Sequence, residues 1–76
     1  MNNNSIIFDL DIYDYNSICK GIEDYTKIAQ INLTCTVQEC ICTFNNCMYE
    51  LSLTQNEFEN YVLGLTIKKQ ASYVLE

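Results

Sequence analysis

Apolar and polar residues alternate over the first part of the chain, which is the pattern of a β-strand with one buried face. The apolar positions are Ile6, Phe8, Leu10 and Ile12, and the positions between them are Ile7, Asp9, Asp11 and Tyr13. Successive side chains of a strand point to opposite faces of the sheet, so this period gives one buried face and one wet, acidic face. The segment is predicted to be the first strand, preceded by a polar, disordered start over residues 1–4.

The spacing of apolar residues then changes to that of an α-helix. One helical face, at the spacing i, i+4, i+7 and i+11, is formed by Ile18, Ile22, Tyr25 and Ala29. Because Asp14, Asn16 and Ser17 are residue types that favour helix N-caps, we expect a helix from about Asn16 to Lys27. Gly21 inside this helix costs roughly 1 kcal/mol relative to alanine, which predicts close packing at that point.

A β-hairpin is predicted over residues 31–44, where apolar residues again occupy every second position. A turn at Gln38–Glu39 would place Val37 opposite Cys40, Cys35 opposite Cys42 and Leu33 opposite Phe44. Residues directly opposite one another in a hairpin share a face of the sheet. The hairpin would therefore present one continuous apolar, cysteine-containing face to the helices.

Residues 47–53 allow two interpretations. Asn45–Asn46 favours a second turn, since asparagine tolerates left-handed conformations. A further strand after that turn would place on the inner face Cys47, Tyr49, Leu51 and Leu53. The alternative is a loop that leads into the last helix.

The last helix is predicted over residues 54–73. Thr54 and Glu57 have the spacing of a capping box at a helix N-terminus. One apolar stripe consists of Phe58, Tyr61, Val62 and Leu65, and a second, offset stripe consists of Leu63, Ile67, Ala71 and Val74. A helix packed on one side of a sheet needs only one stripe. The second is either a contact for a partner or part of a broad buried face.

These elements predict an α+β fold formed by a single small domain, residues 1–76, in the order β-α-β-β-(β)-α. The bracketed strand is the segment after the second turn. The sheet is expected to be antiparallel, with two helices packed on one face. A chain of 76 residues lies near the lower limit for folding without a metal or a disulfide.

Composition narrows the functional classes. The chain has no histidine, which removes the commonest general base and the commonest neutral metal ligand. Its net charge of −6 argues against binding nucleic acid or an anionic membrane through a basic surface. The N-terminal segment lacks the basic region of a signal peptide, and no window approaches the roughly 18 apolar residues of a spanning helix. We therefore expect a cytoplasmic protein with reduced thiols and no cofactor.

Four of the five cysteines lie close together in the predicted hairpin, as Cys35, Cys40, Cys42 and Cys47. They could ligate a metal, but their spacing follows strand alternation rather than the tight knuckles of zinc sites. A disulfide is a second alternative, and the predicted pairing would join Cys35 to Cys42. The leading interpretation is that all four are small buried apolar residues of the sheet.

Two further features are candidate sites. Cys19, near the start of the first helix, is the best candidate for a reactive thiol, because a helix N-terminus lowers a thiol's pKa. An acidic patch that could dock a basic peptide, or supply an acid–base pair, consists of Asp9, Asp11, Asp14, Glu23 and Asp24. An inert thiol and a solvated acidic surface are the simpler interpretations of the two features.

The chain resembles the HxsD family, the His-Xaa-Ser system proteins encoded beside radical SAM enzymes in peptide-modification clusters. The similarity begins at Phe8-Asp9, continues through Ile12-Tyr13, Ile18, Lys20 and Tyr25, and resumes at Glu57, Phe58, Asn60 and Leu63. Lys68 and Lys69 stand where that family tends to have a Leu-Arg step, and the cysteine-rich hairpin is a departure from it. The resemblance implies an accessory protein in ribosomal-peptide maturation and no catalytic residues.

The leading hypothesis is accordingly a noncatalytic module that binds a precursor peptide or a radical SAM enzyme. An exposed hairpin edge could accept a peptide strand, and Leu63, Ile67 and Val74 could dock on the enzyme, with Asp9 and Asp11 as further contacts. A homodimer is also possible. The alternatives are a small acidic inhibitor of a host enzyme, of the phage-encoded or nucleic-acid-mimic type, and a metal or redox protein that uses the cysteines.

Overall fold

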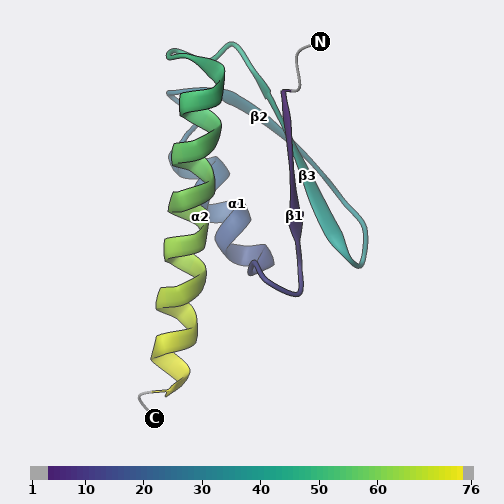
Figure 1. Cartoon of the computed structure of the whole chain (residues 1–76), viewed down its shortest axis with the longest axis vertical. Helices are drawn as coiled ribbons and strands as arrows, with labels where there is room; N and C mark the ends of the chain where they lie inside the picture. The colour runs from purple at the N-terminus through teal and green to yellow at the C-terminus, as the bar shows by residue number, and fades with distance from the viewer. Residues whose placement is uncertain (1–3, 75–76) are drawn as a thin grey trace.

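A three-stranded sheet and two helices make up the protein (Figure 1). The structure is a computed structural model that describes the backbone of residues 4–74 and the side chains of residues 4–69. The elements in chain order are β1 (Ser5–Asp9), α1 (Tyr15–Asp24), β2 (Gln30–Cys35), β3 (Glu39–Asn45) and α2 (Leu51–Val74). The predicted disordered start falls largely on residues 1–3, outside the described part. Asn4 is described, and its backbone carbonyl accepts a hydrogen bond of 2.8 Å from the Phe44 N–H.

The sheet is antiparallel, with β3 in the centre and β1 and β2 at the two edges. Figure 1 shows both helices on the same side of this sheet. Residues Cys40, Cys42 and Phe44 of β3 are buried under them, because every second side chain of a strand points to the same face. The α+β fold class predicted from the sequence is confirmed.

The centre of the core is Phe58 of α2, which is fully buried. Its ring meets those of Phe8, Tyr25 and Phe44 edge-on, at centroid distances of 5.9, 5.2 and 5.3 Å. Edge-to-face packing places the positive rim of one ring against the negative face of another. One aromatic residue of α2 thus joins β1, the end of α1 and β3.

Helix α1 packs closely on α2 through Gly21. A Cβ atom at this position would lie 3.0 Å from Val62 Cγ2 and 3.2 Å from Phe58 Cε1. The close packing predicted from this glycine is confirmed. The predicted helix runs too far, since α1 ends at Asp24 and the N–H of Tyr25 bonds to the carbonyls of the last turn.

The first strand is shorter than the alternation predicted. The Asp9 carbonyl accepts hydrogen bonds from Ile12 and Tyr13, and the Asp9 carboxylate accepts one from the Asp11 N–H. These bonds form a turn that ends the strand pairing. As a result Ile12 is 57% exposed, and Tyr13 instead packs its ring on Phe8 at 4.8 Å. The predicted inward position of Ile12 is wrong.

The predicted hairpin forms, but its register differs from the expected one by two residues. Cys35 pairs with Cys40, Leu33 with Cys42, and Ile31 with Phe44. A shift of two leaves every side chain on its predicted face, whereas a shift of one would have reversed them all. Four residues, Thr36 to Glu39, separate the paired Cys35 and Cys40, whereas the predicted turn had two residues between its first paired positions.

Residues 47–50 form a loop, and the optional strand is absent from this segment. Helix α2 begins at Leu51, so the predicted start at Thr54 is wrong. Thr54 is buried in the first turn, where its hydroxyl donates to the Glu50 carbonyl at 2.9 Å. Cys47 and Leu51 lie against the core, but Tyr49 and Leu53 are exposed, contrary to their predicted inner position.

Candidate interaction site

The free edge of β2 carries an unpaired row of backbone groups. Among the described residues, β2 pairs only with β3. The Thr36 N–H donates to the Glu39 carbonyl at 2.8 Å, and alternate residues of an antiparallel pair bond across the ladder. The N–H and C=O groups of Gln30, Asn32 and Thr34 therefore face β3. Those facing away from the sheet belong to Ile31, Leu33 and Cys35.

This free edge lacks the usual features that prevent pairing with another chain. Exposed edges in natural proteins carry charged residues, prolines or bulges. From Ile28 to Gln38 the chain has no charged residue, no proline and no glycine. Asn32 and Thr34 are exposed on one side of the strand, while Ile31 and Leu33 are half-buried on the helix side. The β2 edge is thus an uncharged strand that is open along one side.

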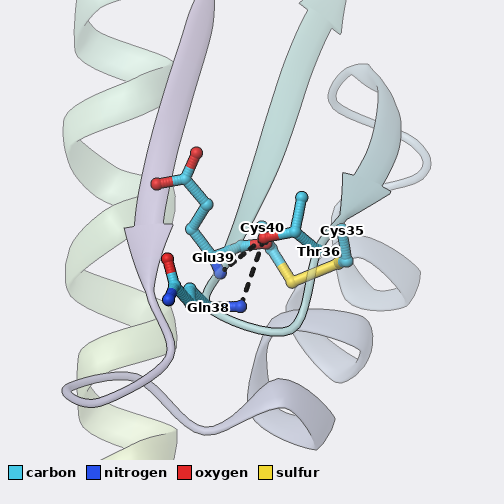
Figure 2. The surroundings of a disulfide bond; sticks show 5 residues. All are labelled: Cys35, Thr36, Gln38, Glu39 and Cys40. Atoms are coloured by element: carbon cyan, nitrogen blue, oxygen red, sulfur yellow. Dashed lines mark hydrogen bonds between the residues drawn. A yellow bond between two sulfur atoms is a disulfide. The ribbon is translucent and has the colours of Figure 1, made fainter.

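A disulfide between Cys35 and Cys40 closes the end of this strand (Figure 2). The two residues are direct cross-strand partners with a Cα–Cα distance of 4.1 Å. A pair that does not exchange backbone hydrogen bonds brings its Cα atoms closest, at about 4.5 Å, and this pair is of that kind. The disulfide joins the last residue of β2 to the central strand.

The side chain of Thr36 holds the loop that follows. Its hydroxyl oxygen accepts hydrogen bonds of 3.2 Å from the N–H groups of both Gln38 and Glu39, drawn as dashed lines in Figure 2. Val37, at the tip of the loop, is 94% exposed. Threonine side chains that bond to the backbone two residues on are a known turn device. Thr36 therefore replaces the glycine or asparagine that a tight hairpin would need.

The cysteine predictions have mixed outcomes. Cys40 and Cys42 are fully buried, as the core interpretation required. Cys35 is exposed and lies in a disulfide, so for Cys35 and Cys40 the expectation of reduced thiols is wrong. The pairing considered as an alternative, Cys35 with Cys42, is also wrong because of the shifted register. Burial raises the pKa of the Cys42 thiol to about 12, which leaves that thiol protonated and unreactive.

The four-cysteine metal site considered from the sequence does not form. Two of its sulfurs are bonded to each other, and Cys47 lies in the loop before α2. Among the described residues, no group of three or more cysteine, aspartate or glutamate side chains comes together in a way that could hold a metal ion. Cys19 lies in the second turn of α1, half-buried, where its side chain is hydrogen-bonded to Tyr15 and raises the tyrosine's pKa.

A hollow of about 260 Å³ lies between the β1–α1 loop and α2. Its polar groups bond to one another: Lys69 Nζ lies 3.1 Å from the Asp14 carboxylate, and the Asp14 N–H donates to the Thr66 hydroxyl. Partial burial acts to raise the pKa of Asp14, but hydrogen bonds from Lys69 and Ser17 outweigh it and lower the pKa below its usual value. The polar groups of Asp14, Thr66 and Lys69 in this hollow therefore already bond to one another, where they cap the start of α1.

The other predicted contact residues are spread over the molecule. Asp9 and Asp11 are exposed at the end of β1, on the edge of the sheet opposite β2. On α2, Leu63 is half-buried and Ile67 is 54% exposed, while the side chain of Val74 lies outside the described part. Asp11 lines the same hollow as Thr66 and Lys69 of α2, whereas Leu63 and Ile67 do not line it.

The residues that carry the family resemblance divide between core and surface. Phe58 is the centre of the core, Glu57 and Asn60 are exposed, and Leu63 is half-buried. No family model, no curated protein and no solved structure matches this chain. Within the described residues, no helix is long and apolar enough to cross a membrane.

The sequence pattern missed one residue of the candidate site, Thr36, and one pairing, that of Cys35 with Cys40. It placed the hairpin turn at Gln38–Glu39 and so overlooked both the role of Thr36 and the pairing of Cys35 with Cys40. The useful signal was the eleven-residue stretch from Ile28 to Gln38 without a charge. Although 14 of the 76 residues are charged, an edge strand within this stretch lacks the charges that usually prevent pairing with another chain.

Proposed function

We propose that this protein is a noncatalytic binding module that takes up an extended peptide along the free edge of β2. The observation that carries the proposal is the row of outward backbone groups on Ile31, Leu33 and Cys35, in a strand that has no protecting charge or proline. A peptide added to a sheet edge gains affinity from main-chain hydrogen bonds and specificity from alternate side chains. No arrangement of acids, bases or thiols in the described residues offers an equally complete site for chemistry.

The size of the edge sets the expected affinity. Three residues supply one donor and one acceptor each, and every hydrogen bond is worth about 0.5–1.5 kcal/mol net. Ordering the peptide and losing its freedom of motion offset much of this gain, so dissociation constants in the range of about 1 mM to 1 µM are expected. Ile31 and Leu33 on one side, and Asn32 and Thr34 on the other, would distinguish apolar from polar side chains of the peptide.

The resemblance to the HxsD family suggests which peptide this is. An edge strand holds a bound peptide in an extended form, and a precursor peptide could be presented to a radical SAM enzyme in that form. The net charge of −6 favours a peptide with basic residues outside the paired segment. Exposed Ile67 on α2 is a further contact available for the enzyme itself.

The test uses a probe peptide that can pair with β2. Its sequence is that of residues 30–35 with serine in place of cysteine and one lysine added at each end, labelled for fluorescence anisotropy. The lysines match the charge of the protein and keep the probe soluble. Saturable binding is expected, and a pull-down with the precursor peptide and radical SAM enzyme of the same gene cluster extends the test to natural partners.

A pair of variants at Leu33 separates backbone from side-chain effects. Leu33→Pro removes the outward N–H and leaves the ladder to β3 intact, since proline is tolerated where an edge N–H faces solvent. Leu33→Ala loses the same side chain and keeps the N–H. Binding is expected to be lost in the first and largely kept in the second. Equal loss in both, with both variants folded by circular dichroism, would contradict pairing through the backbone.

Ile7→Pro is the matched control on the other edge of the sheet. The Phe44 N–H donates to the Asn4 carbonyl, so by the same alternation the N–H of Ile7 faces away from β3. Ile7 is also exposed, so its replacement removes little packing. Probe binding is expected to be unchanged. A loss of binding in Ile7→Pro alone would place the peptide on β1 instead.

A further inference from the structure

The disulfide is one of few contacts that hold the end of β2 on the sheet. The loop from Thr36 to Glu39 contains none of the residues that favour tight turns, namely glycine, proline, asparagine or aspartate. Exposed Val37 at its tip is a strand-favouring residue and contributes no packing. Apart from the disulfide, this loop is held by the hydrogen bonds between Thr36 and residues 38–39 and by one of 3.0 Å from the Leu10 N–H to the Gln38 carbonyl. Beyond these Thr36 hydrogen bonds, the sequence of the loop does little to keep the end of β2 on the sheet.

The two ends of the disulfide are held very differently. Cys40 is fully buried in the central strand and pairs on its other side with Phe8 of β1. Cys35 is exposed, is the last residue of β2, and pairs with Cys40 alone. If the bond is cut, Cys40 stays in place because β1 still holds it, and the end of β2 is the part that detaches.

Cys35 also belongs to the proposed peptide site. Its N–H and C=O are the last two of the six outward groups on the edge, next to those of Leu33. We propose that the Cys35–Cys40 disulfide is a redox switch for this edge: the oxidised protein binds an extended peptide, and the dithiol form binds it weakly. This inference rests on the function proposed above, since it concerns the same edge.

The chemical step is ordinary thiol–disulfide exchange with an external dithiol. A thiolate of the dithiol attacks the exposed Cys35 sulfur, the bond between the two sulfurs breaks, and Cys40 leaves as a thiolate that takes a proton. The second thiol of the reagent then attacks the mixed disulfide and releases Cys35 as a thiol. Two electrons pass to the protein and the reagent ends as a disulfide. Cys42, buried and protonated, takes no part.

The binding test compares redox states of one protein with the lysine-flanked probe. Wild-type protein is measured after oxidation and again in excess dithiothreitol, beside Cys35→Ser and the matched control Cys42→Ala, which keeps the disulfide. Losing two of six hydrogen bonds should raise the dissociation constant about tenfold or more. That rise is expected on reduction of the wild type and of Cys42→Ala. Cys35→Ser should bind weakly with or without dithiothreitol.

A second measurement keeps the inference distinct from the proposed function. Amide hydrogen exchange of Thr34 and Thr36, which bond to β3, should become faster on reduction, whereas exchange at Cys40, which faces β1, should not. Oxidised protein that fails to bind the probe would sink the proposed function and the switch together. The switch would be overturned by equal binding of the probe to both redox forms, or by amide exchange rates at Thr34 and Thr36 that do not change on reduction. Either result would leave the proposed peptide site unaffected.

Discussion

The interior around Phe58 and the free edge of β2 are held together by different means. Phe58 is fully buried and meets three other aromatic rings from three elements. No residue of β2 is fully buried: Ile31 and Leu33 are half-buried against the core, and the strand is otherwise held by one ladder of hydrogen bonds and one disulfide. Side-chain packing stabilises the interior, whereas backbone hydrogen bonds and a disulfide mainly hold the edge in place.

This difference separates stability from binding in a chain of 76 residues. Packed aromatic rings supply most of the free energy of folding in so small a domain, since each buries about 150–250 Å². A strand that contributes little to that packing can keep one side open for another chain. We therefore expect substitutions in the interior to act on unfolding, and changes at the edge to act mainly on binding.

The largest effect is expected from Phe58→Ala. Loss of a fully buried phenylalanine costs about 3–5 kcal/mol, because the cavity left behind adds to the lost burial. The comparison variant is Leu33→Ala, whose half-buried side chain should cost only about 1 kcal/mol. The free energy of unfolding from urea titration, followed by circular dichroism, measures both. Similar losses in the two variants would erase the distinction between interior and edge.

The disulfide is expected to rank second. Closing a loop of this size stabilises a protein by about 2 kcal/mol, mainly by restricting the unfolded chain. Reduction with dithiothreitol should lower the urea midpoint of the wild type by the corresponding amount. The same reagent should leave Cys35→Ser unaffected, because that variant has no disulfide to lose. A wild-type midpoint that does not move on reduction would show that the link adds nothing to stability.

The same contrast explains what the sequence could and could not predict. Side-chain periodicity identified the three strands and most of their inward faces, because buried positions of a strand recur at every second residue. The cost of a glycine inside a helix indicated the close approach at Gly21. Register is less strongly specified. A slip of two residues leaves every inward face unchanged, so the pattern alone could not separate the pairing of Cys35 with Cys40 from its pairing with Cys42.

Buried threonines are the second feature that an apolar pattern misses. Thr54 and Thr66 lie on the same line of α2 as Phe58 and Val62, at a spacing of four residues, and all four are buried. Each threonine hydroxyl donates to the carbonyl four residues earlier in the chain, at 2.9 Å. The helix itself accepts the protons of these hydroxyl groups, so they can enter the core, and the Thr66 oxygen also accepts a hydrogen bond from the Asp14 N–H. Tyr61, assigned to this stripe by its hydrophobicity, is instead partly exposed.

Gly21→Ala tests the fit of the interior on a finer scale. Alanine gains about 1 kcal/mol of helix propensity, but its methyl group would meet Val62 and Phe58, both fully buried and unable to move aside. A net loss of about 1 kcal/mol is expected. Gly64→Ala is the matched control in α2, where no atom lies within 4 Å of the added methyl group, and it should gain up to about 1 kcal/mol. Stabilisation by both substitutions would mean that the helices are not in close contact at Gly21.

The smallest effect is expected at the ion pair between Asp14 and Lys69, where α1 begins beside α2. Asp14→Asn keeps a good N-cap residue and removes the charge, so a loss of about 0.5 kcal/mol is expected near neutral pH. The pKa of Asp14 is lowered in the folded protein, so its contribution is present above the unfolded value of about 3.9 and is lost as the pH falls through the folded pKa. Wild type and variant should therefore differ in urea stability at pH 7 and converge in strong acid. The Lys69→Met variant should show the same convergence, and a difference that persists at low pH would assign the effect to capping rather than charge.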